Sequence, residues 1–186
     1  MKTFKKPYPN VHIQLNEILG KEKIYQSLKN YDIHFAITNQ FIESPNIIIY
    51  PIYKESLVLV TSNNHPLNNK EKIELSDLVK QPFIISKPGF QTREDILNAF
   101  SLEGLRPTIH YEIERFETAC SLVGEGLGIT ILPESYLKYS SENKLHIQHI
   151  NNPALTRSVY LAYFKDRYQP PIVYDLCDRI RHFFDS

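Results

Sequence analysis

The segment ETACSLVGEGLGITILP, residues 117–133, contains the pattern that decides the fold class. Residues 117–125 predict a helix, because apolar side chains recur there at helical spacing. A glycine-rich turn that starts at Gly126 ends this helix, since glycine readily adopts the left-handed conformation of a helix terminus. Residues 129–132 then predict a buried strand, which ends at Pro133 because proline cannot donate to a ladder. A helix that leads through a turn into a buried strand is typical of an α/β protein.

Helix-like and strand-like patterns alternate along the rest of the chain, which favours an α/β fold with mainly parallel sheets. The run at 57–60 is apolar on both faces, as expected of an interior parallel strand. Further strands are predicted at residues 11–15, 33–37, 83–85, 108–113, 145–150 and 158–164. Helices are predicted at residues 21–30, 76–79 and 92–103, and from Pro171 to Phe184.

Composition excludes several classes of protein. The 186 residues include 21 Lys+Arg and 21 Asp+Glu, and this balance argues against a nucleic-acid-binding domain. No apolar run is long enough to cross a bilayer, and the start MKTFKK leads into Pro7–Asn10 instead of an apolar signal sequence. Two cysteines do not make a disulfide framework. We therefore expect a cytoplasmic protein of one large domain or two small lobes, with both thiols reduced.

Three loops follow predicted parallel strands, and ligands bind at such strand ends in open α/β folds. The loops are Thr38–Gln40, Ser86–Gln91 and Glu114–Glu117. The second and third lead into helix N-termini, whose backbone N–H groups and positive dipole end favour an anion.

Hydroxyl and basic groups lie close to these loops in the sequence: Ser86, Thr92, Thr118, Lys87, Arg93 and Arg115. The hydroxyls could add hydrogen bonds to a bound anion. The alternative is that Thr92 and Thr118 only cap their helices and bind no ligand.

No residues indicate catalysis, a metal or a cofactor. Cys120 and Cys177 fall on predicted apolar helix faces, where inert buried thiols lie. His146 and His149 point to opposite faces of a predicted strand and do not converge as zinc ligands do. The sequence has no Gly-x-Gly-x-x-Gly and no Gly-Lys-Ser/Thr phosphate loop. We therefore predict a protein that is not an enzyme.

Short motifs follow one another in order along nearly the whole chain, from about Tyr8 to Phe184. They include YPNV at 8–11, DIHFAI at 32–37, ESLVLV at 55–60, HPL at 65–67, LSDL at 75–78, GLRP at 104–107 and LVGEGLGI at 122–129. In this order and spacing, the motifs resemble the effector-binding domain of LysR-type transcriptional regulators.

The resemblance implies a two-lobed fold like that of a periplasmic binding protein, in which each lobe is a mostly parallel sheet flanked by helices. Lobe one would comprise residues 1–80 and 145–186, and lobe two residues 81–144. A small effector would bind in the cleft between them. The resemblance and the loops together predict these effector-binding residues: Thr38, Asn39, Ser86, Gly89, Phe90, Gln91, Thr92, Phe116 and Thr130.

The implied function is that of a sensor for a small carboxylate or other anion, acting as a homodimer or homotetramer and without contact to a membrane. Helix 21–30 would pack against a neighbour's helix 92–103. DNA would be bound only through an N-terminal domain that these residues lack. Alternatives with the same architecture are the solute-binding protein of a transporter and an enzyme such as a dehydratase.

The resemblance also implies a gap at the start of the chain. Residues 1–4 correspond to the middle of the family's first helix, so the usual first strand is expected to be missing. This would leave an unpaired position in the sheet, and an exposed strand edge favours aggregation or strand swapping.

Overall fold

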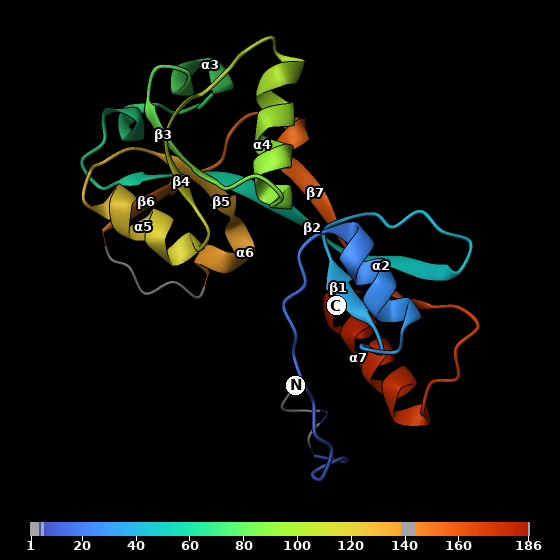
Figure 1. The fold of residues 1–186 in the computed structure, drawn as a ribbon. Coiled ribbons are helices and arrows are strands. Elements are labelled where there is room, and N and C mark those ends of the chain that lie inside the picture. The colour runs from blue at the N-terminus through green and yellow to red at the C-terminus, as the bar shows by residue number, and fades with distance from the viewer. Residues whose placement is uncertain (1–3, 5, 139–143, 186) are drawn as a thin grey trace. The chain divides into compact units, whose positions relative to one another are not determined.

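The computed structural model describes residues 4, 6–138 and 144–185. The chain forms two compact units: unit 1 comprises residues 1–53 and 158–186, and unit 2 comprises residues 54–157 (Figure 1). Both units combine helices with strands, which confirms the α/β class.

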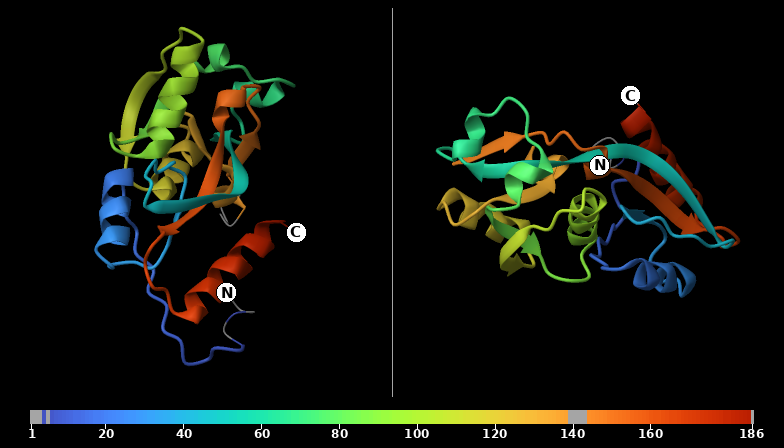
Figure 2. Two further views of the ribbon diagram at one scale, coloured as in Figure 1. Left: turned by 90° about the vertical axis from the view of Figure 1, so that its right-hand side faces the viewer. Right: turned by 90° about the horizontal axis from the view of Figure 1, so that it is seen from above.

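Unit 1 contains α2 (Lys21–Lys29), β1 (Ala36–Thr38) and α7 (Pro171–Asp185). Two long strands, β2 (Ile47–Ser62) and β7 (Thr156–Phe164), are neighbours in the sheet and pass from one unit into the other (Figure 2). The remaining elements belong to unit 2: α3 (Leu75–Leu78), β3 (Pro82–Ser86), α4 (Gln91–Leu102), β4 (Thr108–Ile113), α5 (Phe116–Gly124), β5 (Thr130–Pro133), α6 (Glu134–Leu137), β6 (Leu145–Gln148) and the 3-10 helices Pro66–Asn69 and Pro153–Leu155.

The divisions between the units fall after residues 53 and 157, whereas the sequence placed the lobe boundaries after residues 80 and 144. The difference has a physical basis in the core of unit 2. Leu57, Leu75 and Leu155 pack in one buried cluster with Phe83 and Phe100. Residues on both sides of the expected boundaries therefore share one core.

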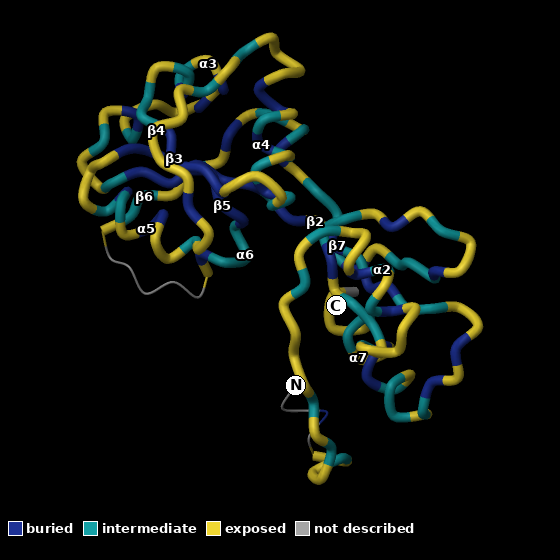
Figure 3. Tube along the Cα trace, in the orientation of Figure 1, coloured by how far each residue is buried: buried dark blue, intermediate teal, exposed yellow. Residues whose placement is uncertain are grey.

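The core of unit 2 is built on the central stretch of β2, residues 57–60, which is buried throughout (Figure 3). Alternate residues of a strand point to opposite faces. Leu57 and Leu59 pack in a cluster that includes α4, while Val58 and Val60 pack in a second cluster that includes α5. The prediction of an interior strand that is apolar on both faces is confirmed. Its ladders with β5 and β6 are antiparallel, so the prediction that this strand is parallel to its neighbours is wrong.

The strands β3 and β4 pair in parallel, and each is followed by a helix, α4 and α5 respectively. The segment before β5 joins β3 closely: the N–H of Ile129 donates to the carbonyl of Pro82, at 2.9 Å. A Cβ atom at Gly128 would lie 2.3 Å from the same carbonyl oxygen. Only glycine fits at this close approach, so Gly128 lets β5 lie beside β3.

The sheet of unit 1 is covered by one helix on each face. The strands β1 and β7 are antiparallel, with Ala36 opposite Ala162. Ala36 packs in the cluster of α2 residues, whereas the preceding Phe35 packs with Val173 and Cys177 of α7. Since neighbouring residues of an extended chain point to opposite faces, α2 and α7 lie on opposite sides of this sheet.

A buried ionic network joins β2, α4 and the start of β7 within unit 2. The Arg157 guanidinium donates to Glu55 at 2.7 and 2.9 Å and to Asp95 at 2.9 Å. Ser135 also donates its hydroxyl to Glu55. Glu55 is 6% exposed, so its charge depends on Arg157 for compensation.

The predicted strand at residues 11–15 is wrong. This segment forms no strand, because a strand needs a hydrogen-bonded neighbour and the described residues supply none. The alternative that Thr92 and Thr118 cap their helices is also wrong. Phe90 and Arg115 are the N-cap residues of α4 and α5, and neither makes a side-chain cap hydrogen bond. Gly89, with φ of 93°, turns the chain so that α4 begins before Thr92.

We expect Arg157→Met to lower the free energy of unfolding by about 3–5 kcal/mol, because it leaves the buried Glu55 and the partly buried Asp95 without their cation. Arg179→Met is the matched control, since Arg179 pairs with Asp175 on the partly exposed face of α7. The control should lower the free energy of unfolding by no more than about 0.5 kcal/mol. Urea unfolding measures the free energy of unfolding of both variants. Equal decreases in the two variants would show that the Arg157 network stabilises the fold no more than an exposed ion pair does.

We expect Gly128→Ala to destabilise unit 2 by about 1–3 kcal/mol, because the new methyl group overlaps the Pro82 carbonyl. Gly124→Ala is the control: its Cβ would make an ordinary contact, 3.6 Å from Lys144, at the end of α5. Alanine is the better helix former, so this variant should be neutral or up to about 1 kcal/mol more stable. A thermal unfolding scan that ranks Gly128→Ala as the more stable variant would contradict the steric argument.

Candidate functional site

The carboxyl ends of β3 and β4 meet at one edge of unit 2. The N–H of Lys87, just after β3, donates to the carbonyl of Ile113 at the end of β4, at 2.8 Å. Both α4 and α5 begin at this edge, after N-caps that supply no side-chain acceptor. The first backbone N–H groups of a helix have no partner within it. Two helix N-termini therefore present donors at the same edge of the sheet.

Five of the predicted site residues lie together here: Ser86, Gly89, Phe90, Gln91 and Thr92. Ser86 ends β3 and is 3% exposed. The next residues turn at Gly89, and Gln91 and Thr92 are the first two residues of α4. Thr92 is buried, and its hydroxyl accepts a hydrogen bond from Arg157 at 3.2 Å instead of capping the helix.

Two further predicted residues belong to the same unit. Phe116 is the first residue of α5, and its ring packs edge-on against Tyr136, with centroids 5.2 Å apart. Thr130 is 2% exposed and donates its hydroxyl to the carbonyl of Ile84, at 2.8 Å. The Thr130 side chain thus braces β5 against β3.

Thr38 and Asn39 lie in unit 1, at and after the end of β1. The Thr38 hydroxyl oxygen accepts a hydrogen bond from the N–H of Gln40, at 3.1 Å. That bond holds a turn at the carboxyl end of the strand. The role of these two residues in ligand binding stays a prediction.

Two of the basic side chains at the edge of unit 2 are paired with acids. Lys87 bonds to Glu114 at 2.8 Å, and Arg93 bonds to Glu112 at 2.6 Å. The hydrogen bond between Lys87 and Glu114 raises the pKa of Lys87 and lowers that of Glu114. Arg93 also donates to the carbonyl of Ser86, at 2.8 Å. An anion near Lys87 and Arg93 would therefore meet cations that are already paired, whereas Arg115, the N-cap residue of α5, is exposed at the same edge.

Sequence reasoning missed the connection between this edge and the ionic network. Arg157 donates to the Thr92 hydroxyl at 3.2 Å, as well as to Glu55 and Asp95. A signal was present, because Glu55 begins an apolar run in β2 and charges rarely lie inside such strands. The partner was not apparent, because Arg157 is 102 residues away in the sequence.

Both cysteine thiols are inert because they are buried. Cys120 and Cys177 are 0% and 5% exposed, which confirms the prediction that both are buried. Burial raises the pKa of Cys177 to about 11. Within residues 4, 6–138 and 144–185, no group of three or more His, Cys, Asp or Glu side chains could hold a metal ion. No helix in the same ranges is long and apolar enough to cross a membrane.

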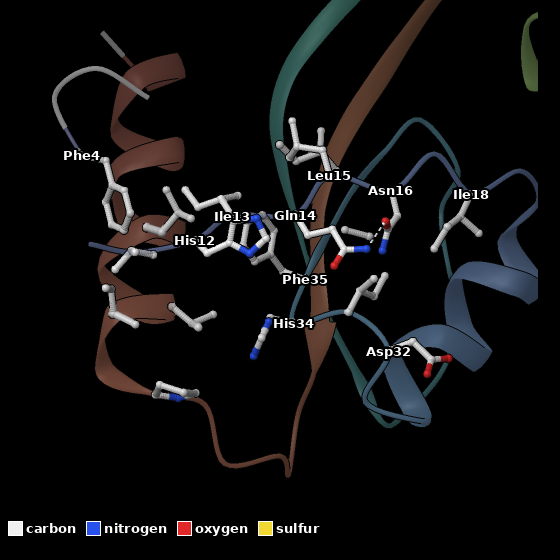
Figure 4. A pocket seen from close by; sticks show the side chains of 18 of the residues that line it. Phe4, His12, Ile13, Gln14, Leu15, Asn16, Ile18, Asp32, His34 and Phe35 are labelled. Atoms are coloured by element: carbon white, nitrogen blue, oxygen red, sulfur yellow. Dashed lines mark hydrogen bonds between the residues drawn. The ribbon is translucent and has the colours of Figure 1, made fainter. Parts of the chain in front are cut away.

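Unit 1 contains a cavity of about 620 Å³ that lies away from the predicted residues (Figure 4). Two chain segments, residues 11–16 and 32–37, line it, together with Ile24 of α2 and Val173 and Leu176 of α7. Sequence analysis did not predict a cavity, although it expected an unpaired position in this sheet.

The family model described as the LysR substrate binding domain matches residues 1–185. Curated relatives include an uncharacterised HTH-type transcriptional regulator, YybE, of Bacillus subtilis, which is 28% identical over 91% of this chain and 57% of its own length. The regulator BenM of Acinetobacter baylyi is 28% identical over 97% of this chain and 60% of its own length. This chain thus spans about three-fifths of the length of these relatives.

Solved structures show the same fold. The regulatory domain of CcmR from Synechocystis, in complex with 2-PG, has a TM-score of 0.89 and 21% identity, covering 100% of this chain and 89% of its own. The effector-binding domain of BenM with its effector benzoate has a TM-score of 0.84 and 25% identity, over 99% and 83% of the chains. The effector-binding domain of QuiR in complex with shikimate has a TM-score of 0.83 and 26% identity, covering 99% of this chain and 88% of its own.

These likenesses confirm the resemblance seen in the sequence and the two-lobed fold class that it implied. The family consists of domains of transcriptional regulators and is not a family of enzymes, in agreement with the prediction. Because its model matches residues 1–185, the chain belongs to the LysR substrate-binding domain family.

Proposed function

We propose that this chain is the ligand-sensing part of a cytoplasmic LysR-type transcriptional regulator and that it binds a small anionic metabolite at the carboxyl edge of β3 and β4. The observation that carries the proposal is the pair of helix N-termini, of α4 and α5, that open at this edge without side-chain caps. Backbone N–H groups and the positive dipole ends of two helices favour a negative charge there.

The related structures support the chemical class. BenM is seen with benzoate and QuiR with shikimate, and both ligands are carboxylates. A carboxylate has oxygen acceptors but no strong donors, so it matches an edge built from N–H and O–H groups. Because Lys87 and Arg93 are paired with acids, these neutral donors and the exposed Arg115 would supply the attraction.

The predicted residues have distinct roles in this proposal. Ser86 and the first turn of α4, from Gln91 to Thr92, would hydrogen-bond the anion. Gly89 and Phe90 would shape the loop that admits it, and Phe116 would offer an apolar wall. Thr130 would position β5, since its hydroxyl already bonds to Ile84.

Sensing requires that the ligand favour one state of the protein. A ligand can shift an equilibrium only by its difference in affinity between the states. We infer that these states are arrangements of two or four copies of the chain, in which α2 of one copy packs against α4 of its partner. In the longer regulator, the arrangement would reposition DNA-binding domains that lie outside residues 1–186.

Isothermal titration with a panel of small carboxylates and phosphorylated acids tests the proposed site. At least one anion should bind, and Ser86→Ala should weaken it by about tenfold or more, because a hydrogen bond to a charged group contributes about 1.5–3 kcal/mol. Ser121→Ala is the matched control, since that hydroxyl is exposed and bonds to Glu117 within α5. Unchanged affinity in Ser86→Ala would remove the β3 loop from the site.

Sedimentation over a range of protein concentrations tests the proposed assembly. We expect a dimer or tetramer, and we expect the bound anion found above to change its association constant. A strict monomer at every concentration, with and without the anion, would contradict the proposed mode of sensing.

A further inference from the structure

Thr92 carries a backbone donor that is available to a ligand at the proposed site. It is the second residue of α4 and is 5% exposed. Arg93 and Glu94 donate their N–H groups to the carbonyl of Phe90, which closes the first turn. The N–H of Thr92 has no acceptor among the residues that the structure describes. The first N–H groups of a helix have no partner within it, and a bound anion satisfies them.

The hydroxyl of the same residue has its direction fixed by Arg157. The Thr92 oxygen accepts from the guanidinium at 3.2 Å. A threonine hydroxyl has one donor and two acceptor positions, whereas a guanidinium only donates. The hydroxyl proton must therefore point to another group, and it has no acceptor within residues 4, 6–138 and 144–185. Thr92 thus offers an N–H and an O–H, which suit the two oxygens of a carboxylate or a phosphate.

A second hydroxyl is tied to the same turn. Ser86 is 3% exposed, and Arg93 of α4 donates to its carbonyl at 2.8 Å. The Ser86 hydroxyl has no hydrogen-bond partner in the described part of the chain. A polar side chain this buried normally has a partner. The hydroxyl of Ser86 is therefore available to a ligand, and this observation is independent of the helix terminus.

The Arg157 guanidinium is itself held in one orientation. Glu55 of β2 accepts from it at 2.7 and 2.9 Å through one carboxylate oxygen, and Ser135 donates to the other oxygen. Asp95 of α4 accepts from Arg157 at 2.9 Å through one oxygen, and Gln91 donates to the other at 2.7 Å. Each carboxylate that holds the guanidinium is thus oriented by a further side chain, so Arg157 has little freedom to turn away from Thr92.

We propose that Arg157 is a positioning residue for anion recognition: by donating to the Thr92 hydroxyl, it directs the hydroxyl proton toward the bound anion. A hydrogen bond accepted from a cation also polarises the hydroxyl and strengthens the bond that it donates. The inference rests on the proposed function and deepens it. It assigns the site to groups that only accept, such as carboxylates and phosphates, and it excludes a protonated amine, which only donates.

A double-mutant cycle on anion affinity tests the inference. Thr92→Val removes the hydroxyl at nearly constant volume, and Arg157→Lys keeps the positive charge without the planar fork. The probes are benzoate, shikimate and inorganic phosphate, measured by isothermal titration. Thr92→Val should weaken binding by about tenfold or more. Arg157→Lys should weaken it at least threefold in the wild-type background, but less than twofold in the Thr92→Val background.

Glu55→Gln replaces Arg157→Lys in the cycle if the lysine variant does not fold. It loosens the hold on the guanidinium without removing it, and the same dependence on the Thr92 hydroxyl is expected. Arg179→Lys is the matched control. It changes an arginine that pairs with Asp175 in α7, and it should leave the affinity unchanged in both backgrounds.

The outcomes separate this inference from the proposed function. Equal weakening by Arg157→Lys with and without the Thr92 hydroxyl would overturn the inference, because a purely structural role acts alike in both backgrounds. If Ser86→Ala still weakened binding in that case, the proposed site would stand and only the role of Arg157 would be removed. Absence of binding by all three probes and by the panel above would overturn the proposed function, and this inference with it.

Discussion

The Arg157 guanidinium is the group on which the arrangement of unit 2 most depends. It compensates two carboxylates, Glu55 from β2 and Asp95 from α4, and thereby fixes the start of β7 against both elements. A planar guanidinium can serve several acceptors at once, which an ammonium group does with less geometric order. Since Glu55 is almost fully buried, removing one member of the network leaves an uncompensated charge, which lowers the free energy of unfolding.

The same guanidinium connects the core to the proposed site. Its bond to the Thr92 hydroxyl holds the first turn of α4, where the anion is proposed to bind. With Lys87 and Arg93 both paired, little unneutralised positive charge remains at this edge from these two residues. Recognition there would depend on the positions of N–H groups, which favour a ligand of defined shape as well as negative charge.

Local patterns in the sequence predicted most of the elements. The segment 117–133 and the apolar run at 57–60 predicted a helix and two strands that the structure contains, because periodicity and burial are encoded within a few neighbouring residues. The helix starts were misplaced by about two residues at Thr92, since the turn at Gly89 decides where α4 begins.

Features that depend on distant partners were not predictable from such patterns. The alternation at 11–15 is that of a strand, but a ladder needs a neighbour, which local sequence does not reveal. Two other interactions also join residues that are distant in the sequence. They are the ion pair of Glu55 with Arg157 and the hydrogen bond from the Thr130 hydroxyl to the Ile84 carbonyl. For the proposed site, the sequence identified the loop around Ser86 as a candidate but did not reveal that Lys87 and Arg93 are paired with acids.

Both cysteine thiols of the chain are buried and therefore unreactive toward reagents in solution. Burial raises the pKa of the Cys177 thiol to about 11, so the thiol is protonated at neutral pH. Cys120 is fully enclosed. A cysteine introduced on the surface of each unit would therefore react alone with maleimide dyes or spin labels, so that the separation of the units can be followed spectroscopically in the otherwise native chain.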